Sequence, residues 1–357
     1  MKEFGCKNYQ NRVGVLIAQL GTPDAPTPKA VRPYLRQFLS DPRVIEVNRI
    51  LWQFILNLVV LPTRPKRSAR LYSRIWTKEG SPLLVITKKQ TEKLGALINQ
   101  GRRDPIEVVF GMRYGTPSIE SAIDALIAKG CSRILLFPMY PHYAGATTGS
   151  TYDAAFKHLL KKRWVPTLKV AQPYYTHPKY IQALSKIIDE EYQKLSWRPD
   201  KLILSYHGIP YKYVQKGDPY CCMCVETTEA FLKVTSLPKE EVVHTYQSRF
   251  GRDPWLQPYT DKTVEAEASA GVTKIAVAAP GFTADCLETL DELGNEARES
   301  FMHNGGKEFH IIPCLNDHEA WISGMKEIVE EELGNWMQDS NGCEGGCRTC
   351  PMASIKI

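Results

Sequence analysis

The sequence lacks four features, and each absence argues against a broad class of protein. No G-x-G-x-x-G or Walker pattern follows a predicted strand, which argues against a bound nucleotide cofactor. The longest apolar run, residues 50–62, covers roughly 20 Å at helical rise and is too short to span a bilayer. The net charge of +6 has no concentrated basic stripe beyond residues 64–75, so a nucleic-acid partner is not expected. No signal peptide precedes Val13, and we therefore expect a reducing, cytoplasmic environment.

A disulfide framework is also not expected, although the sequence contains ten cysteines. In a reducing compartment such residues serve more often as buried thiols or metal ligands. The chain has 357 residues, of which 43% are hydrophobic and 24% charged, as is typical of a soluble globular protein. This length predicts two domains or one large α/β domain.

The apolar segment 50–62, ILWQFILNLVVLP, allows two interpretations. It contains Trp52 and Phe54, and an aromatic segment with basic flanks can lie on an anionic membrane surface. The alternative is a helix buried in the core. The basic residues that border the segment are Arg43, Arg49, Arg64, Lys66, Arg67 and Arg70.

Six short runs rich in β-branched residues alternate with helical patterns, among them residues 118–130 and 263–271. Such alternation indicates βαβ units and an α/β fold with parallel sheets. The predicted strands are residues 13–20, 106–112, 133–140, 201–207, 242–248 and 274–280.

The two halves of the chain repeat one another in outline. QLGTP (19–23) closes the first predicted strand, and YHGIP (206–210) closes the strand that opens the second half. This repetition predicts two Rossmann-like halves with a boundary between residues 170 and 200. Ligands of such sheets bind beyond the carboxyl ends of the strands. We therefore expect one cleft between the halves, built from Leu20, Arg113, Tyr140, His207, Arg249 and Phe282.

His207 and a row of glutamates are the candidate catalytic groups. A lone histidine is more often structural, but at the end of a parallel strand it can accept a proton or bind a metal. Glu288, Glu292 and Glu296 recur every four residues and share one helical face. A solvated acidic face is the simpler explanation of this row. Because Glu288 follows a strand end, the row could instead face the ligand of His207 and pass a divalent cation inward.

Eight motifs, in order and over nearly the whole chain, resemble those of ferrochelatases, the enzymes that insert ferrous iron into a porphyrin to make haem. The proteobacterial branch is the most similar. The motifs are LGTPDAP (20–26), YSRIWTKEGSPL (72–83), GMRYGTPSI (111–119), PMYPHYAGATTGS (138–150), SYHGIPYKYVQKGDPY (205–220), QSRFGRDPWLQPYTD (247–261), PGFTADCLETLDEL (280–293) and IPCLND (312–317).

The resemblance implies roles for individual residues. His207 and Glu288 match the central pair that handles iron and the two pyrrole protons, with His207 acting either as a base or as an iron ligand. Glu292 and Glu296 match an acidic ladder for incoming iron. Cys286 stands where many relatives carry a histidine, and we interpret it as a small packing residue. The substrate-binding positions that match are the apolar wall Leu20, Tyr140, Trp255, Pro280 and Phe282 and the orienting pair Arg113 and Tyr114.

The tail sequence NGCEGGCRTCP (341–351) resembles the C-terminal extension that binds a 2Fe-2S cluster in animal and some bacterial ferrochelatases. A cluster bound by cysteine alone needs four thiolates, and the tail supplies three. Gly145 matches the position of the fourth ligand in the animal pattern, so another cysteine must replace it. The predicted ligands are Cys343, Cys347 and Cys350 with one of Cys221, Cys222 and Cys224.

Two other metal sites share features with this tail. The C-x3-C-x2-C spacing also occurs in radical S-adenosylmethionine enzymes, but there it belongs early in a barrel. Zinc is the second alternative, because thiolates and one further ligand satisfy its tetrahedral coordination. Cys131 and Cys314 lie in apolar strand contexts and are predicted to be buried thiols, whereas Cys6 is a remote candidate ligand.

The sequence therefore predicts a lyase that inserts Fe2+ into protoporphyrin IX in the last step of haem biosynthesis. The alternatives are a coproporphyrin or other metal chelatase and a porphyrin- or haem-binding protein without turnover. The predicted domains are residues 1–185 with a hydrophobic lip at 50–62, residues 186–335, and the cysteine-rich extension 336–357. The expected partners are porphyrin, ferrous iron and a membrane surface contacted by the lip, with peripheral docking on the inner membrane. A homodimer is compatible with the resemblance.

Overall fold

The structure, a computed structural model, describes residues 12–251 and 253–337. The three tail cysteines, Cys343, Cys347 and Cys350, and the N-terminal Cys6 lie outside the described residues.

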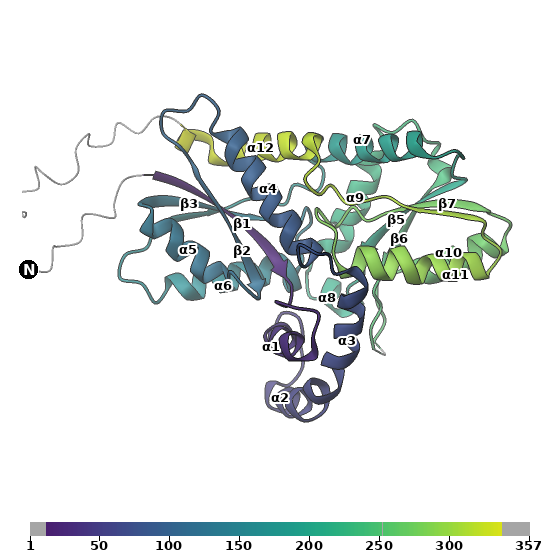
Figure 1. The fold of residues 1–357 in the computed structure, drawn as a ribbon, viewed down its shortest axis with the longest axis horizontal. Helices are drawn as coiled ribbons and strands as arrows, with labels where there is room; N and C mark the ends of the chain where they lie inside the picture. The colour runs from purple at the N-terminus through teal and green to yellow at the C-terminus, as the bar shows by residue number, and fades with distance from the viewer. Residues whose placement is uncertain (1–11, 252, 338–357) are drawn as a thin grey trace, which may run out of the picture.

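Eight described strands form two four-stranded parallel sheets with the same topology (Figure 1). The strand order is β2-β1-β3-β4 in the first sheet and β6-β5-β7-β8 in the second. In each sheet the earliest strand of the half lies second, which confirms the predicted α/β fold of two similar halves. The strands are β1 (Arg12–Gly21), β2 (Glu107–Tyr114), β3 (Cys131–Pro138), β4 (Thr167–Val170), β5 (Lys201–His207), β6 (Val242–Gln247), β7 (Lys274–Ala278) and β8 (Glu308–Ile311).

The helices cover both faces of each sheet and also form a separate lobe. The α-helices are α1 (Pro28–Leu39), α2 (Arg49–Ile55), α3 (Leu61–Ile75), α4 (Pro82–Ile98), α5 (Ile119–Ala128), α6 (Ser150–Leu159), α7 (Pro178–Lys194), α8 (Tyr211–Gln215), α9 (Tyr220–Leu232), α10 (Thr260–Ser269), α11 (Arg298–His303) and α12 (Glu319–Leu333). The π-helical segments are η2 (Leu56–Val60), η3 (Gly145–Gly149) and η5 (Glu288–Ala297), and the short 3₁₀ helices are η4 (Lys239–Glu241) and η6 (Gly334–Met337).

Alternating side chains of the central strands belong to different cores. Val15 and Ile17 of β1 join a core that also contains Leu202 and Leu204 of β5, whereas Leu16 of β1 packs with helix α5 on the opposite face. Successive side chains of a strand point to opposite faces, so a strand buried on both sides is apolar at nearly every position. The first core therefore connects the two halves.

Helices α7 and α12 complete this shared core. Trp321 of α12 is fully buried and its ring lies 5.8 Å from Tyr174 and 6.2 Å from Tyr180 of α7. Helix α12 belongs to the second half in sequence but also contacts α4 and β3 of the first half. The predicted boundary at residue 185 falls inside α7.

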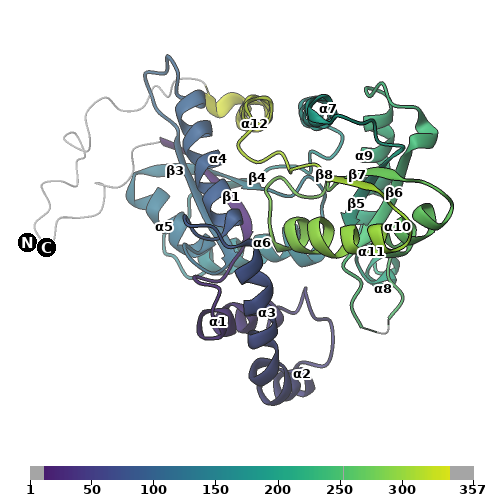
Figure 2. The ribbon, with the colours of Figure 1, turned by 45° about the vertical axis from the view of Figure 1, so that its right-hand side comes forward.

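Helices α1, α2 and α3 with η2 form a lobe that projects from the two sheets (Figures 1 and 2). Leu56 and Leu61 are buried within the lobe, together with Tyr72 of α3. The side chains of α2 itself are not buried, so the interpretation of segment 50–62 as a core helix is wrong. The apolar surface of α2 and η2 is the predicted lip.

Candidate active site

His207 is the last residue of β5, a central strand of the second sheet, and a loop follows it. Its Nδ1 atom lies 2.6 Å from the carbonyl oxygen of Gly208. Because a carbonyl only accepts hydrogen bonds, Nδ1 carries the proton and Nε2 is the basic nitrogen of the neutral ring. The ring centroid lies 6.4 Å from those of Trp255 and Phe282. His207 can therefore accept a proton from a ligand at this end of the sheet.

Glu288, Glu292 and Glu296 lie on the π-helix η5, in which backbone hydrogen bonds join residue i to residue i+5. Glu288 and Glu292 are half-buried and Glu296 is exposed. The row thus leads from the surface toward the interior, where the charge of Glu292 interacts with His207. Carboxylate oxygens arranged in this way can pass a divalent cation.

The end of β6 fixes the carboxylate of Glu292. The hydroxyl of Ser248 donates to Oε2 of Glu292 at 2.5 Å, and Nε2 of Gln247 donates to the carbonyl oxygen of Glu288 at 3.1 Å. Burial raises the pKa of Glu292, and Glu288 raises it further, against the lowering effects of the Ser248 hydroxyl and of His207. A carboxyl group with a raised pKa beside an imidazole can hold or release a proton.

Leu20 and Arg113 lie side by side at the end of the first sheet. The pairing of β1 with β2 sets Gln19 opposite Met112 and Gly21 opposite Tyr114. Gly21 has φ +111°, and a Cβ atom there would lie 1.7 Å from the carbonyl oxygen of Tyr114, so this approach requires glycine. Leu20 also packs in a cluster with Leu287, the residue before the acidic row. The two halves therefore meet at this point.

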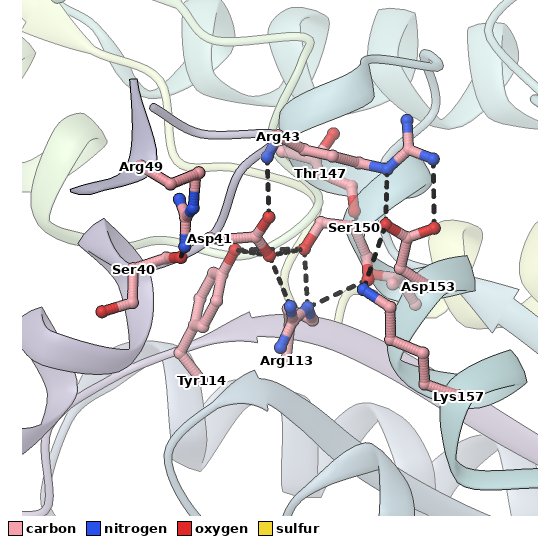
Figure 3. Close-up of polar contacts among 11 residues, drawn as sticks. Ser40, Asp41, Arg43, Arg49, Arg113, Tyr114, Thr147, Ser150, Asp153 and Lys157 are labelled. Atoms are coloured by element: carbon pink, nitrogen blue, oxygen red, sulfur yellow. Dashed lines mark hydrogen bonds and ion pairs between the residues drawn. The ribbon is translucent and has the colours of Figure 1, made fainter. Parts of the chain in front are cut away.

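A buried carboxylate, Asp41, organises the polar side chains of the first half (Figure 3). It follows α1 and is 4% exposed. Its Oδ2 atom accepts from Arg113, from the hydroxyl of Tyr114 at 2.9 Å and from the hydroxyl of Ser150 at 2.6 Å. The backbone N–H of Arg43 donates to Oδ1 at 2.8 Å. This network connects the lobe to β2 and α6.

The remaining residues of the predicted cleft and wall differ in environment. Tyr140 is half-buried, and its hydroxyl is buried without a hydrogen-bond partner among the described residues. Burial raises the pKa of Tyr140 well above its usual value. Pro280 is buried, and its carbonyl oxygen accepts from Tyr180 at 2.6 Å. Arg249 is exposed, with its guanidinium 5.0 Å from the ring centroid of Tyr259.

Sequence reasoning missed Asp41, Ser150, Gln247 and Ser248. Asp41 stands in SDPR, which has the composition of a turn, and its partners are distant in sequence. Ser248 has φ 68°. Gln247 and Ser248 open the motif QSRFGRDPWLQPYTD and end the predicted strand 242–248. This position was the available signal, because ligands gather at strand ends.

The six cysteines of the described residues differ in exposure. Cys131 and Cys314 are buried, as predicted. Cys286 is also buried and packs with Leu83, in agreement with a packing role. On α9, Cys221 is half-buried, Cys222 is exposed and Cys224 is fully buried in the shared core.

Gly145 lies beside the start of α9. Its backbone N–H donates to Oδ2 of Asp218 at 2.7 Å, and Asp218 lies two positions before Tyr220, the first residue of that helix. Between residues 12 and 337, no three His, Cys, Asp or Glu side chains form a closed metal site. No helix in this described range is both long and apolar enough to cross a membrane.

Solved structures share the architecture of two wound α/β halves. SirB from Bacillus subtilis, determined with Fe3+, matches with a TM-score of 0.54 at 10% identity, over 91% of this chain and 96% of that chain. A sirohydrochlorin chelatase SirB from Bacillus subtilis subspecies spizizenii, in complex with cobalt, matches with a TM-score of 0.52 at 10% identity, over 91% and 96% of the two chains. The fold is therefore that of chelatases.

Sequence comparison defines the family. The family model for ferrochelatase matches residues 12–333. A ferrochelatase of Rhodopseudomonas palustris strain BisB5 is 49% identical, over 91% of this chain and 94% of its own length. A ferrochelatase of Janthinobacterium sp. strain Marseille is 47% identical, over 91% and 88%. This chain belongs to the ferrochelatase family.

Proposed function

We propose that the protein inserts ferrous iron into protoporphyrin IX and thereby acts as a porphyrin lyase of haem biosynthesis. The observation that carries this proposal is the meeting of His207 with the acidic row of η5 at the strand ends of the second sheet. Insertion removes two N–H protons from the porphyrin and delivers a dication, so it needs a base and oxygen ligands at one place. Family membership supports the same reaction.

In the proposed reaction His207 accepts pyrrole protons through Nε2, the nitrogen that Gly208 leaves free. Trp255 and Phe282 flank the imidazole and supply apolar surface for the porphyrin ring, as Leu20 and Tyr140 do from the first half. Iron approaches along Glu296, Glu292 and Glu288, from the exposed to the half-buried end of the row. In this proposal, one set of side chains accepts the two porphyrin protons and another set binds the incoming iron cation.

The test is anaerobic metallation of protoporphyrin by His207→Ala and Glu288→Gln variants, followed by absorbance. We expect His207→Ala to lose at least about 100-fold in kcat, because general-base catalysis contributes roughly 10²–10⁴-fold. Glu288→Gln should also lower kcat, because it removes a charged oxygen ligand from the path of the cation. Normal rates in both variants would contradict the assigned site. Porphyrin binding without turnover in the wild-type protein would instead support the non-catalytic alternative.

We also propose that the tail binds a 2Fe-2S cluster together with Cys222. Cys222 is exposed in the first turn of α9, whereas Cys224 is buried and its burial raises the pKa of the thiol well above its usual value. A cluster ligand must be a thiolate, and an exposed thiol meets this requirement more easily. Loss of cluster absorbance in Cys222→Ser, with retention in Cys221→Ser and Cys224→Ser, is the expected result. A colourless wild-type protein with stoichiometric zinc would contradict it.

We further propose that the lip docks on an anionic membrane surface. Its outward side chains are apolar, and arginines flank them. Indole Nε1 of Trp52 donates to the carbonyl oxygen of Leu39 at 2.6 Å, which ties α2 to the end of α1. The most exposed apolar side chains of the lip are Ile50 (73%), Leu51 (60%), Phe54 (62%), Leu58 (73%) and Val59 (57%). Peripheral binding at the inner membrane would bring the site close to a lipophilic substrate. The homodimer is a separate prediction.

A further inference from the structure

The ion pair of Asp41 and Arg113 lies beside Leu20, a residue of the predicted wall, yet neither the proton transfer nor the iron path uses it. Arg113 neighbours Leu20 across the paired strands β1 and β2. Its Nη2 atom donates to Asp41, and its Nε atom donates to the hydroxyl of Ser150 at 2.6 Å. The side chain of Arg113 is 19% exposed and that of Asp41 is 2% exposed. The carboxylate is therefore buried, and the guanidinium is the more exposed member of the pair.

The charge of Arg113 stays balanced at neutral pH. Burial acts to raise the pKa of Asp41, but the hydroxyl of Ser150, the N–H of Arg43 and the charge of Arg113 together hold that pKa below its usual value. Asp41 is thus ionised, and the pair has no net charge. A guanidinium without this partner would be a strong receptor for a carboxylate, because charge-assisted pairs are about twice as strong as neutral hydrogen bonds.

We infer that Asp41 is a positioning residue that determines porphyrin specificity by neutralising Arg113. This inference rests on the proposed porphyrin metallation. A neutral wall beside Leu20 suits the methyl and vinyl edge of a dicarboxylic porphyrin. A tetracarboxylic porphyrin would have to bring an additional carboxylate toward this wall, where the negative charge of Asp41 cancels the attraction of Arg113.

The test compares Asp41→Asn with the wild-type protein on protoporphyrin and coproporphyrin, with Fe2+ under anaerobic conditions. Asparagine keeps the shape of the side chain and removes its charge. We expect the ratio of kcat/KM for coproporphyrin to kcat/KM for protoporphyrin to rise at least about tenfold, chiefly through a lower KM for coproporphyrin. Asp41→Glu keeps the negative charge and should therefore show the wild-type ratio.

Two further variants separate specificity from stability. Asp153→Asn removes a carboxylate of the same network that pairs with Arg43 at 2.8 Å, and it should leave the ratio unchanged. Adding Arg113→Gln to Asp41→Asn removes the unbalanced charge and should return the ratio toward that of the wild-type protein.

The possible results distinguish a role of Asp41 in specificity from a purely structural role. Equal losses on both porphyrins in Asp41→Asn, with a lowered Tm, would mean that Asp41 is only structural and would overturn the inference. If Asp41→Asn fails to fold, a ratio that is the same in Asp41→Glu, Arg113→Gln and the wild-type protein would overturn it as well. A wild-type protein that metallates neither porphyrin would overturn the proposed function itself.

Discussion

Ser248 is the residue whose effect on the site can be tested most directly. Its hydroxyl stabilises the ionised form of Glu292, the half-buried carboxylate next to His207. Ser248→Ala and Ser248→Gly remove this donor, and glycine also accepts the φ of 68° at this position. The pKa of Glu292 should then rise further, because a lost hydrogen bond to the charged form disfavours that form.

We expect the acidic limb of the pH profile of kcat/KM to move to higher pH by roughly 0.5–1 unit in both variants. Steady-state metallation at a series of pH values measures this shift. Ser73→Ala is a suitable control, since Ser73 is an exposed serine of α3 whose hydroxyl bonds only its own helix, to the carbonyl oxygen of Arg70. Superimposable profiles for Ser248→Ala and the wild-type protein would show that the ionisation of Glu292 does not limit the rate.

The sequence locates His207 at the end of β5 and Glu288 at the start of η5, beyond β7, because strand patterns are clear in the chain, and their catalytic role stays a prediction. Asp41 could not be predicted in the same way. Its partners Arg113 and Ser150 lie 72 and 109 positions away in the sequence. A local sequence pattern cannot predict contacts between residues so far apart in the chain. The charge balance of a buried ion pair depends on tertiary contacts, so it becomes visible only in the folded chain.

At the scale of elements, the sequence located six strands, including the edge strands β2 and β6, but missed β4 and β8. Both missed strands contain only four residues, none of them buried, and such short, half-exposed runs weaken the apolar pattern. The surface position of α2 could not be predicted either, because an apolar run has the same sequence pattern in a core as on an exposed surface. The structure shows that no side chain of α2 is buried, so this helix is not part of the core.

The lip allows a matched test of membrane docking. Val59 in the lip is 57% exposed and Val234, after α9, is 50% exposed. Val59→Asp should weaken sedimentation with vesicles that contain anionic lipid by about fivefold or more, because a charge replaces apolar surface at the interface. Val234→Asp introduces the same charge elsewhere and should leave binding unchanged. Equal binding of both variants would remove the lip from the membrane contact.

At the scale of the whole molecule, the shared core between the halves contains a polar group of side chains. His142 lies after β3 and His244 lies in β6. Nε2 of His142 is 2.8 Å from the hydroxyl of Thr227, and Nδ1 of His244 is 2.8 Å from that of Thr228. The ring of Tyr206 lies 5.5 Å from His142 and 4.8 Å from His244. The other nitrogen of each imidazole is buried without a partner in the described chain.

Burial lowers the pKa of His142 to about 3 and that of His244 to about 4. Both imidazoles are therefore neutral in the folded protein at pH 5, whereas the unfolded chain protonates them near pH 6.5. Stability should be unaffected by these groups above pH 6.5 and should fall as the pH drops below it, down to the folded pKa values. The loss is about 2 kcal/mol per histidine at pH 5.

Urea unfolding between pH 5 and 7.5 measures this loss. His244→Gln removes one of the two titrating groups, and its stability should decline less steeply with acid than that of the wild-type protein, by about 2 kcal/mol at pH 5. His303→Gln changes an exposed histidine of α11 and should follow the wild-type curve. If His244→Gln and the wild-type protein lost stability in parallel, the titration of His244 would not contribute to the acid sensitivity.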